Sequence, residues 1–211
     1  MTRSGKIKII VNVLRLTLVV AIIASIFYGS WYNLFVSLFT IFLTFLPTWV
    51  EKKYKIDIPL DFELATILFV YASLFLGVIG NFYERFWWWD ILLHAASAVA
   101  FACIGFVVLF ILFITKKLTS HPVWVAIFSF CFSLSIGALW EIFEFSADQL
   151  FGFTMQKSGL VDTMWDLISD GAGAVVASLA GYFYIKGGQK SYLGRLIDST
   201  IKSNTDLKSS L

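Results

Sequence analysis

The sequence predicts an all-α, polytopic membrane protein built as a bundle of six transmembrane helices. Hydrophobic residues make up 59% of the 211 positions and charged residues only 14%, whereas soluble domains average about 45–50% and about 25%. The apolar residues fall into six long runs, and a helix needs about 20 such residues to cross the hydrocarbon core. Composition and run length together therefore favour a membrane protein over a soluble one.

Turn and charge signals separate the six apolar runs in order along the chain. They lie at residues 29–30, 51–55, 80–81, 116–122 and 152–159, where Gly, Asn, Pro or clustered Lys interrupt the hydrophobic sequence. The predicted spans are residues 7–28, 32–50, 62–82, 89–114, 123–151 and 163–186, inside a transmembrane domain of residues 1–188. Because the connections are short, an antiparallel up-and-down topology is expected.

The positions of Lys and Arg predict that both termini are cytoplasmic. With the amino terminus inside, only Arg85 and Lys157 fall in outer loops, which satisfies the positive-inside rule. The basic residues on the cytoplasmic side are then Lys52, Lys53, Lys55, Lys116, Lys117, Lys186, Lys190 and Arg195. The first span is expected to be retained, because its apolar run is too long for a signal peptide and no clear small-x-small cleavage site follows.

Residues 189–211 form a predicted cytoplasmic tail. Their apolar residues recur at helical spacing among basic ones, which indicates either an amphipathic helix on the inner membrane surface or a solvated tail. The formal net charge of +2 is too small to suggest nucleic-acid binding. The expected partner is therefore the lipid bilayer, and the sequence leaves the oligomeric state open.

Acidic residues gather at the predicted outer ends of the last three spans. Asp90 and His94 lie one turn apart in the fourth span, so the carboxylate is placed to orient the imidazole ring. The fifth and sixth spans carry acids at spacings of three and four residues, which keep each set on one helical face. These acids are Glu141, Glu144 and Asp148 in the fifth span and Asp162, Asp166 and Asp170 in the sixth. We expect them to converge with His94 on one membrane face.

Helix geometry alone explains some of these acids. Asp90 and Asp162 are placed to cap helices, and Asp166 lies where the helix dipole favours a negative charge. Glu141 and Asp170 resist this explanation, since caps and the favourable dipole act only within a turn of a helix N-terminus. A charged side chain near the bilayer centre costs about 2.5–3.5 kcal/mol, so these acids must be hydrated, protonated or paired.

The shortage of positive charge in the outer half predicts a divalent metal ion. Only Arg85, Lys157 and protonated His94 are available there against the acids. Mg²⁺, Mn²⁺ and Ca²⁺ bind oxygen ligands, and one imidazole among carboxylates also suits Zn²⁺ or Fe. The predicted ligands are Asp90, His94, Glu141, Glu144, Asp166 and Asp170. Carboxylates kept neutral for proton transfer, and a water-filled acidic vestibule, stay open as alternatives.

The polar residues of the last three spans form a recognisable pattern. It reads Asp90-x-x-x-His94, Trp140-Glu141-x-x-Glu144 and Gly159-x-x-Asp162-Thr-x-x-Asp166-x-x-x-Asp170-Gly-Ala. Over residues 90–174 this pattern resembles the YjdF-type family of uncharacterised bacterial inner-membrane proteins and, more distantly, the VanZ-like membrane proteins, which tend to carry an amide at position 170. The resemblance implies a bacterial inner-membrane location and a shared polar site, but brings no established reaction.

A second, superficial match is excluded. The four-residue spacing of Asp162, Asp166 and Asp170 is similar to the metal-binding helix of CDP-alcohol phosphotransferases, but the preceding Asp-Gly and Ala-Arg elements of that motif are absent. The predicted outer location also separates these acids from cytoplasmic nucleotides.

Three functions are compatible with the sequence. The first is a metal-dependent hydrolase or transferase acting on a lipid or lipid-linked headgroup, in which the metal activates water and Asp148 or Asp162 serves as the base. The second is a transporter coupled to protons or a divalent cation, because acids within membrane helices commonly mark ion pathways. The third is a non-catalytic assembly protein whose polar residues only specify helix packing.

Overall fold

In the computed structural model, every secondary-structure element of the described residues is a helix, and these residues are 3–54, 58, 60–114 and 121–187. Six of the helical segments are long and apolar enough to cross a membrane, as the sequence predicted. These segments are Gly5–Phe27, Trp31–Lys53, Leu60–Ile79, Trp89–Leu109, Pro122–Phe151 and Leu160–Lys186. The chain divides into two compact units, α1 to α5 and α6 to α8.

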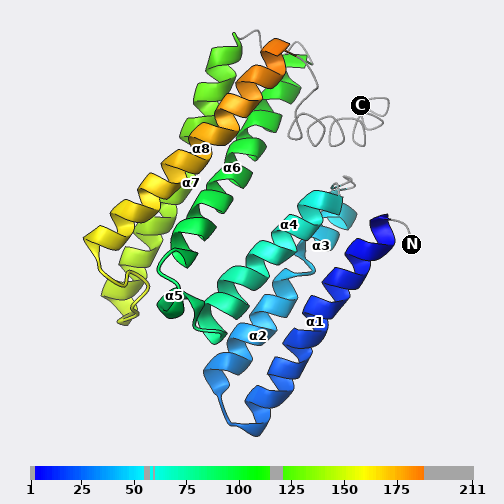
Figure 1. Ribbon diagram of the computed structural model, residues 1–211, viewed down its shortest axis with the longest axis vertical. Helices are drawn as coiled ribbons and strands as arrows, with labels where there is room; N and C mark the ends of the chain where they lie inside the picture. Colours follow the sequence, from blue (N-terminus) through cyan, green and yellow to red (C-terminus); the bar gives the residue numbers. More distant parts are fainter. Residues whose placement is uncertain (1–2, 55–57, 59, 115–120, 188–211) are drawn as a thin grey trace. The chain divides into compact units, whose positions relative to one another are not determined.

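The first unit contains the first three spans. Its elements are α1 (Arg3–Phe27), α2 (Trp31–Leu43), α3 (Leu46–Tyr54), α4 (Leu60–Val70), the π-helix η1 (Tyr71–Ile79) and the short α5 (Phe82–Arg85). In Figure 1, α1, α2 and α4 run beside one another. Five of the basic residues predicted to be cytoplasmic lie outside the described residues, as does the predicted tail of residues 189–211. These five are Lys55, Lys116, Lys117, Lys190 and Arg195.

The second span, predicted over residues 32–50, is divided into two helices. It breaks after Leu43 and resumes at Leu46, because Pro47 lacks an N–H donor and its ring collides with the carbonyl four residues earlier. The Arg15 side chain of α1 fills the break. Its Nε donates to Thr44 Oγ1 at 3.1 Å and its Nη2 to the Thr44 carbonyl at 2.8 Å, while the guanidinium stacks 4.0 Å from the ring centre of Phe45.

The second unit holds the three helices that carry the acids. They are α6 (Trp89–Ile114), α7 (Pro122–Phe151) and α8 (Leu160–Gly187), and all three pack against one another (Figure 1). His121 caps α7, with its Nδ1 accepting a hydrogen bond from the Val123 N–H. Gly152, at φ +68°, ends the helix in the left-handed conformation that glycine adopts without strain.

Small residues bring the three helices close together. A Cβ at Gly173 would lie 2.4 Å from the Ala95 carbonyl oxygen, and one at Gly181 would lie 2.4 Å from the Phe106 ring. The lack of a side chain at these two positions therefore allows close helix packing. Gly171 differs, because nothing lies within 4 Å of a Cβ built there.

Two buried serines tie α7 to α6. The Ser133 hydroxyl donates to the Ala98 carbonyl at 2.7 Å, and the Ser129 hydroxyl donates to the Ala102 carbonyl. Both serines are almost fully buried. Hydrogen bonds of this kind hold transmembrane helices together where lipid offers no competing water, so they define the rotation of α7 against α6.

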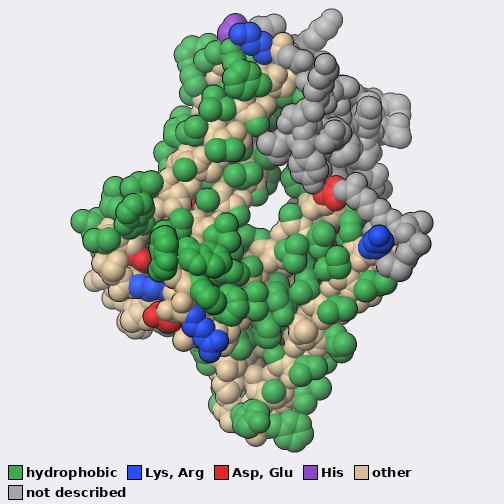
Figure 2. All heavy atoms as spheres, in the orientation of Figure 1, with side chains coloured by type: hydrophobic (Ala, Val, Ile, Leu, Met, Phe, Trp, Pro, Cys, Tyr) green, Lys and Arg blue, Asp and Glu red, His purple; other side chains and the backbone are tan. Residues whose placement is uncertain are grey.

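Hydrophobic side chains cover most of the helix surface seen in Figure 2, and charged side chains appear at only a few places. Phe27, Trp31 and Phe183 are among the large apolar residues that are more than half exposed. Such surfaces are costly in water but suit contact with lipid.

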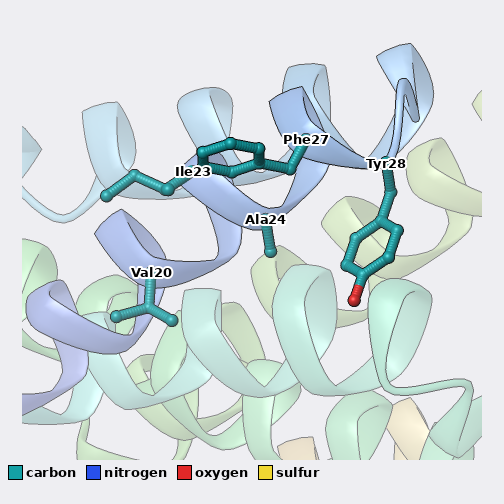
Figure 3. A pocket seen from close by; sticks show the side chains of 5 residues that line it. All are labelled: Val20, Ile23, Ala24, Phe27 and Tyr28. Atoms are coloured by element: carbon teal, nitrogen blue, oxygen red, sulfur yellow. The ribbon is translucent and has the colours of Figure 1, made fainter.

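A shallow apolar depression lies on α1. Its lining residues are Val20, Ile23, Ala24, Phe27 and Tyr28 (Figure 3). It contains no acid, histidine or basic residue. This depression therefore has the chemistry of a helix surface that faces lipid, and the candidate functional site lies instead in the second unit.

Candidate functional site

The first side chains of the site lie at the start of α6. Asp90 belongs to the first turn of that helix, which begins at Trp89, and it is partly exposed. His94 follows one turn later and is buried, with 9% of its surface exposed. Asp90 is therefore a first-turn acid rather than the helix cap that the sequence also allowed.

The acids of α7 differ sharply in their surroundings. Glu141 is 4% exposed, whereas Glu144, one turn later, is partly exposed and accepts a hydrogen bond from the Trp140 indole N–H at 2.9 Å. Asp148 lies nearest the end of the helix and accepts backbone hydrogen bonds from Met155 at 2.8 Å and Gln156 at 2.9 Å. Asp148 thus anchors the loop that leads to α8.

The acids of α8 become more buried with distance from the start of the helix. Asp162 is partly exposed, Asp166 is 3% exposed and Asp170 is 1% exposed. Because α8 begins at Leu160, Asp162 lies in its first turn and does not cap it, in contrast to the cap that the sequence also allowed. The four-residue spacing places all three carboxylates along one face of the helix.

His94 lies among four carboxylates from three helices, which we call the acidic cluster: Asp90, Glu141, Asp166 and Asp170. Its Nε2 atom is 3.9 Å from Asp90 Oδ1, 3.9 Å from Glu141 Oε1 and 4.0 Å from Asp166 Oδ1. The convergence of α6, α7 and α8 on one polar site, expected from the sequence, is thus present in the structure.

The other ring nitrogen of His94 faces a single partner. His94 Nδ1 lies 3.4 Å from both oxygens of Asp170, so Asp170 is the carboxylate that orients the ring. The sequence had assigned this role to Asp90, and that expectation is wrong, because Asp90 approaches Nε2 at 3.9 Å and not within hydrogen-bonding distance. A proton on Nδ1 directed at Asp170 leaves the Nε2 lone pair facing Asp90, Glu141 and Asp166.

A glycine makes room for Asp170. A Cβ at Gly137 of α7 would lie 2.1 Å from Asp170 Oδ2 and 2.7 Å from Asp170 Cγ, which is far inside van der Waals contact. The group packed against Gly137 is therefore a carboxylate of the site itself.

Buried carboxylate oxygens in the acidic cluster lack hydrogen-bond partners. Among the described residues, three such oxygens accept no hydrogen bond of normal geometry: both oxygens of Glu141 and Oδ1 of Asp170. Thr163 lies beside Glu141. Buried polar atoms are nearly always satisfied, and leaving one unsatisfied costs about 1–3 kcal/mol, more for a charged group. A hydrogen-bond donor or a cation beside Glu141 would therefore stabilise its carboxylate.

The loop between α7 and α8 brings one lysine to the acids. Lys157 Nζ lies 3.4 Å from Asp90 Oδ2, and the Lys157 backbone N–H donates to Asp162 Oδ2 at 3.0 Å. The sequence placed Lys157 in an outer loop but contained no signal for its partner, because the contact joins residues 67 positions apart.

Three of the predicted ligands are close enough to share one ion. One ligand atom each from Asp90, His94 and Asp166 lies within 4.8 Å of the other two. Atoms bound to the same ion are separated by at most twice the metal–oxygen distance, about 4–5 Å for Mg²⁺ to Ca²⁺. Glu141 lies beside this group, Asp170 lies behind the imidazole, and Glu144 is engaged with Trp140.

Six apolar helices and a polar site inside the last three define a multi-pass membrane protein. The chain belongs to the family described as "Predicted membrane protein (DUF2238)", whose model matches residues 10–187 and so includes the whole acidic cluster. The chain is also 30% identical over 128 residues to an uncharacterised protein of Thermotoga maritima. That match covers 60% of this chain and 64% of the relative, less than two thirds of its length. No solved structure matches the chain.

Proposed function

We propose that this family member binds a divalent cation within the acidic cluster and uses it to hydrolyse or transfer a lipid or lipid-linked headgroup. The observation that carries the proposal is Glu141, which is 4% exposed, has two oxygens without hydrogen-bond partners and lies 3.9 Å from His94 Nε2. A second anion buried beside it, Asp166, increases the need for positive charge at the same point.

The charge balance supports a bound cation. The acidic cluster holds four carboxylates within helices that have the composition of membrane spans, and each charge near the bilayer centre costs about 2.5–3.5 kcal/mol. Among the described residues, Lys157 and His94 lie within 4 Å of these acids. Lys157 and a neutral imidazole leave three of the four negative charges unbalanced, and a divalent ion would reduce this excess to one.

The donor set suits a hard or borderline ion. Asp90, Asp166 and the Nε2 atom of His94 would hold it, with Glu141 as a further carboxylate ligand. Asp170 then serves as the outer carboxylate that fixes the tautomer of a metal-binding histidine. Carboxylates with one imidazole are compatible with Mg²⁺, Mn²⁺, Ca²⁺ or Zn²⁺. Such an ion supplies Lewis acidity toward a phosphoryl or acyl oxygen and activates water.

The remaining acids have supporting roles in this proposal. Asp162 is the candidate base, because it is partly exposed and lies two turns from Asp170 on the same face of α8. Asp148 is the weaker candidate, since both of its oxygens already accept backbone hydrogen bonds of the loop. Glu144, bonded to Trp140, lies one turn from Glu141 and would complete the site at its exposed side.

The position of the acids along the helices favours an enzyme over a transporter. No Asp, Glu, Lys, Arg or His occurs between His94 and the end of α6, between Pro122 and Leu139 on α7, or between Asp170 and Lys186 on α8. Ion pathways are commonly marked by ionisable residues within the membrane, whereas an enzyme acting on a headgroup needs such residues near one surface only.

Elemental analysis of the purified protein tests the metal. We expect about one divalent ion per chain in the wild type and its loss in Glu141→Gln and Asp166→Asn. Glu84→Gln is the matched control, because Glu84 is an exposed acid on α5 in the first unit and its substitution should leave the metal content unchanged. A wild type without metal, purified from medium supplemented with Mn²⁺ and Zn²⁺, contradicts the proposal.

Lipid turnover tests the reaction. Wild-type protein in vesicles of bacterial lipids should release a headgroup or acyl product in a metal-dependent manner, and Glu141→Gln should lose both metal and turnover. If ions cross the vesicle membrane instead, and Asp166→Asn abolishes that flux, the transporter is the correct function. If neither activity occurs and cells retain full function with the acidic cluster neutralised, the assembly role is correct.

A further inference from the structure

Lys157 occupies a defined position at the exposed side of the acidic cluster. Its side chain is 31% exposed, and its ammonium lies 3.4 Å from Asp90 Oδ2. Asp90 is also one of the three residues whose ligand atoms lie close enough to share an ion. The same carboxylate therefore interacts with the lysine and belongs to the candidate metal-binding group.

The loop that carries Lys157 is held in place on both sides. Asp148 accepts hydrogen bonds from the backbone of Met155 and Gln156, and the Gln156 side chain donates to the Thr163 hydroxyl at 2.6 Å. The Lys157 backbone donates to Asp162. Because these bonds join the loop to the end of α7 and the start of α8, they position the backbone of Lys157 independently of what its ammonium contacts.

A cation and the lysine ammonium compete for Asp90. A carboxylate that donates electron density to a divalent ion retains less negative charge for a second cation, and the ammonium and the ion repel each other. The ammonium of a lysine is a compact charge on a flexible stem with three donors. Binding of the ion therefore weakens the attraction of Asp90 for the ammonium, and the flexible stem lets the ammonium turn toward a negative group that approaches the ion from the exposed side.

We propose that Lys157 is the residue that recognises a phosphate group on the substrate, and that a divalent cation at Asp90 directs it to do so. This inference rests on the proposed function and narrows it to substrates that carry a phosphate beside the reacting bond. Lys157 and the cation would contact the same phosphate from two sides, so that cation binding and phosphate binding strengthen each other. The phosphate would belong either to a lipid headgroup or to a soluble molecule.

Mn²⁺ binding to the full-length protein tests the proposal. Affinity is measured in micelles of a maltoside detergent, which contains no phosphate: alone, with added inorganic phosphate, and with phosphatidic acid included in the micelle. We expect phosphate or phosphatidic acid to tighten Mn²⁺ binding about fivefold or more in the wild type. Lys157→Gln should abolish this effect and should tighten binding of Mn²⁺ alone by roughly two- to fivefold, the range of an exposed ion pair.

Two further variants define the interpretation. Lys157→Arg keeps the charge and should retain the effect of phosphate. Lys186→Gln is the matched control, because Lys186 lies on α8 beside Tyr182, sixteen residues beyond Asp170 in the sequence, and should behave as the wild type. If only phosphatidic acid tightens Mn²⁺ binding, Lys157 recognises lipid headgroups. If only inorganic phosphate does so, Lys157 recognises soluble phosphates.

The outcomes separate this inference from the proposed function. Mn²⁺ binding that neither phosphate source alters, or an effect of phosphate that persists fully in Lys157→Gln, overturns the role of Lys157 and leaves the metal site intact. A wild type that binds no Mn²⁺ under any of these conditions overturns both.

Discussion

Replacing Gly137 by alanine tests whether the close approach of α7 to Asp170 controls the geometry of the site. The new Cβ would lie 2.1 Å from Asp170 Oδ2, and ordinary contact begins at 3.4 Å. The carboxylate therefore has to retreat by about 1.3 Å, a difference taken from these two distances. Since Asp170 is the partner of His94 Nδ1 at 3.4 Å, the imidazole loses its orientation.

The expected loss is large in binding and small in stability. Removing the outer carboxylate contact of a metal-binding histidine typically reduces metal affinity about 10- to 100-fold, and a displacement of about 1 Å lowers activity by about 100-fold. Alanine is more favourable than glycine in a helix by about 1 kcal/mol, which offsets part of the steric cost. Gly137→Ala should therefore unfold at nearly the wild-type temperature.

Gly171→Ala is the matched control. Gly171 also lies in the region of the site, next to Asp170 in the sequence, but nothing lies within 4 Å of a Cβ added there. This variant should keep wild-type Mn²⁺ affinity and gain slight thermal stability. The ¹⁵N chemical shifts of His94 provide a second measurement, since loss of the Asp170 contact changes the ring tautomer whether or not metal is present. Wild-type Mn²⁺ affinity and unchanged His94 shifts in Gly137→Ala would refute this reasoning.

Three further predictions concern contacts outside the ligand set. Arg15→Met removes two hydrogen bonds to Thr44 and a cation–π contact, and should destabilise the first unit by about 2–4 kcal/mol, measured by denaturant unfolding in detergent. Ser133→Ala should cost about 0.6 kcal/mol and at most about 1.7 kcal/mol, whereas Ser135→Ala, whose hydroxyl bonds only within α7, should be nearly neutral in the same assay. Asp148→Ala frees two loop N–H groups and should increase proteolytic cleavage between α7 and α8; unchanged cleavage contradicts its role as the loop anchor.

The limits of the sequence are clearest in the second span. Composition predicts that residues 32–50 cross a membrane, and the structure keeps that length of apolar chain. Composition does not predict the interruption at Thr44 or its contact with Arg15, because Arg15 is distant in sequence and lies within the apolar run of the first span. A charged residue within a membrane span indicates a polar partner. Arg15 is such a residue, and its partner is Thr44.

The sequence alone determined the six spans, the helical faces that carry the acids and the approach of those faces to His94. These features depend on hydropathy and on the 3.6-residue period of the helix, both of which are local properties of the chain. Only the tertiary structure decided that Asp170 rather than Asp90 faces His94 Nδ1, that Gly137 makes room for it, and that Lys157 reaches Asp90. Those contacts depend on the rotation and depth of α6, α7 and α8 against one another, which are set by close packing and buried serine hydrogen bonds between residues far apart in the chain.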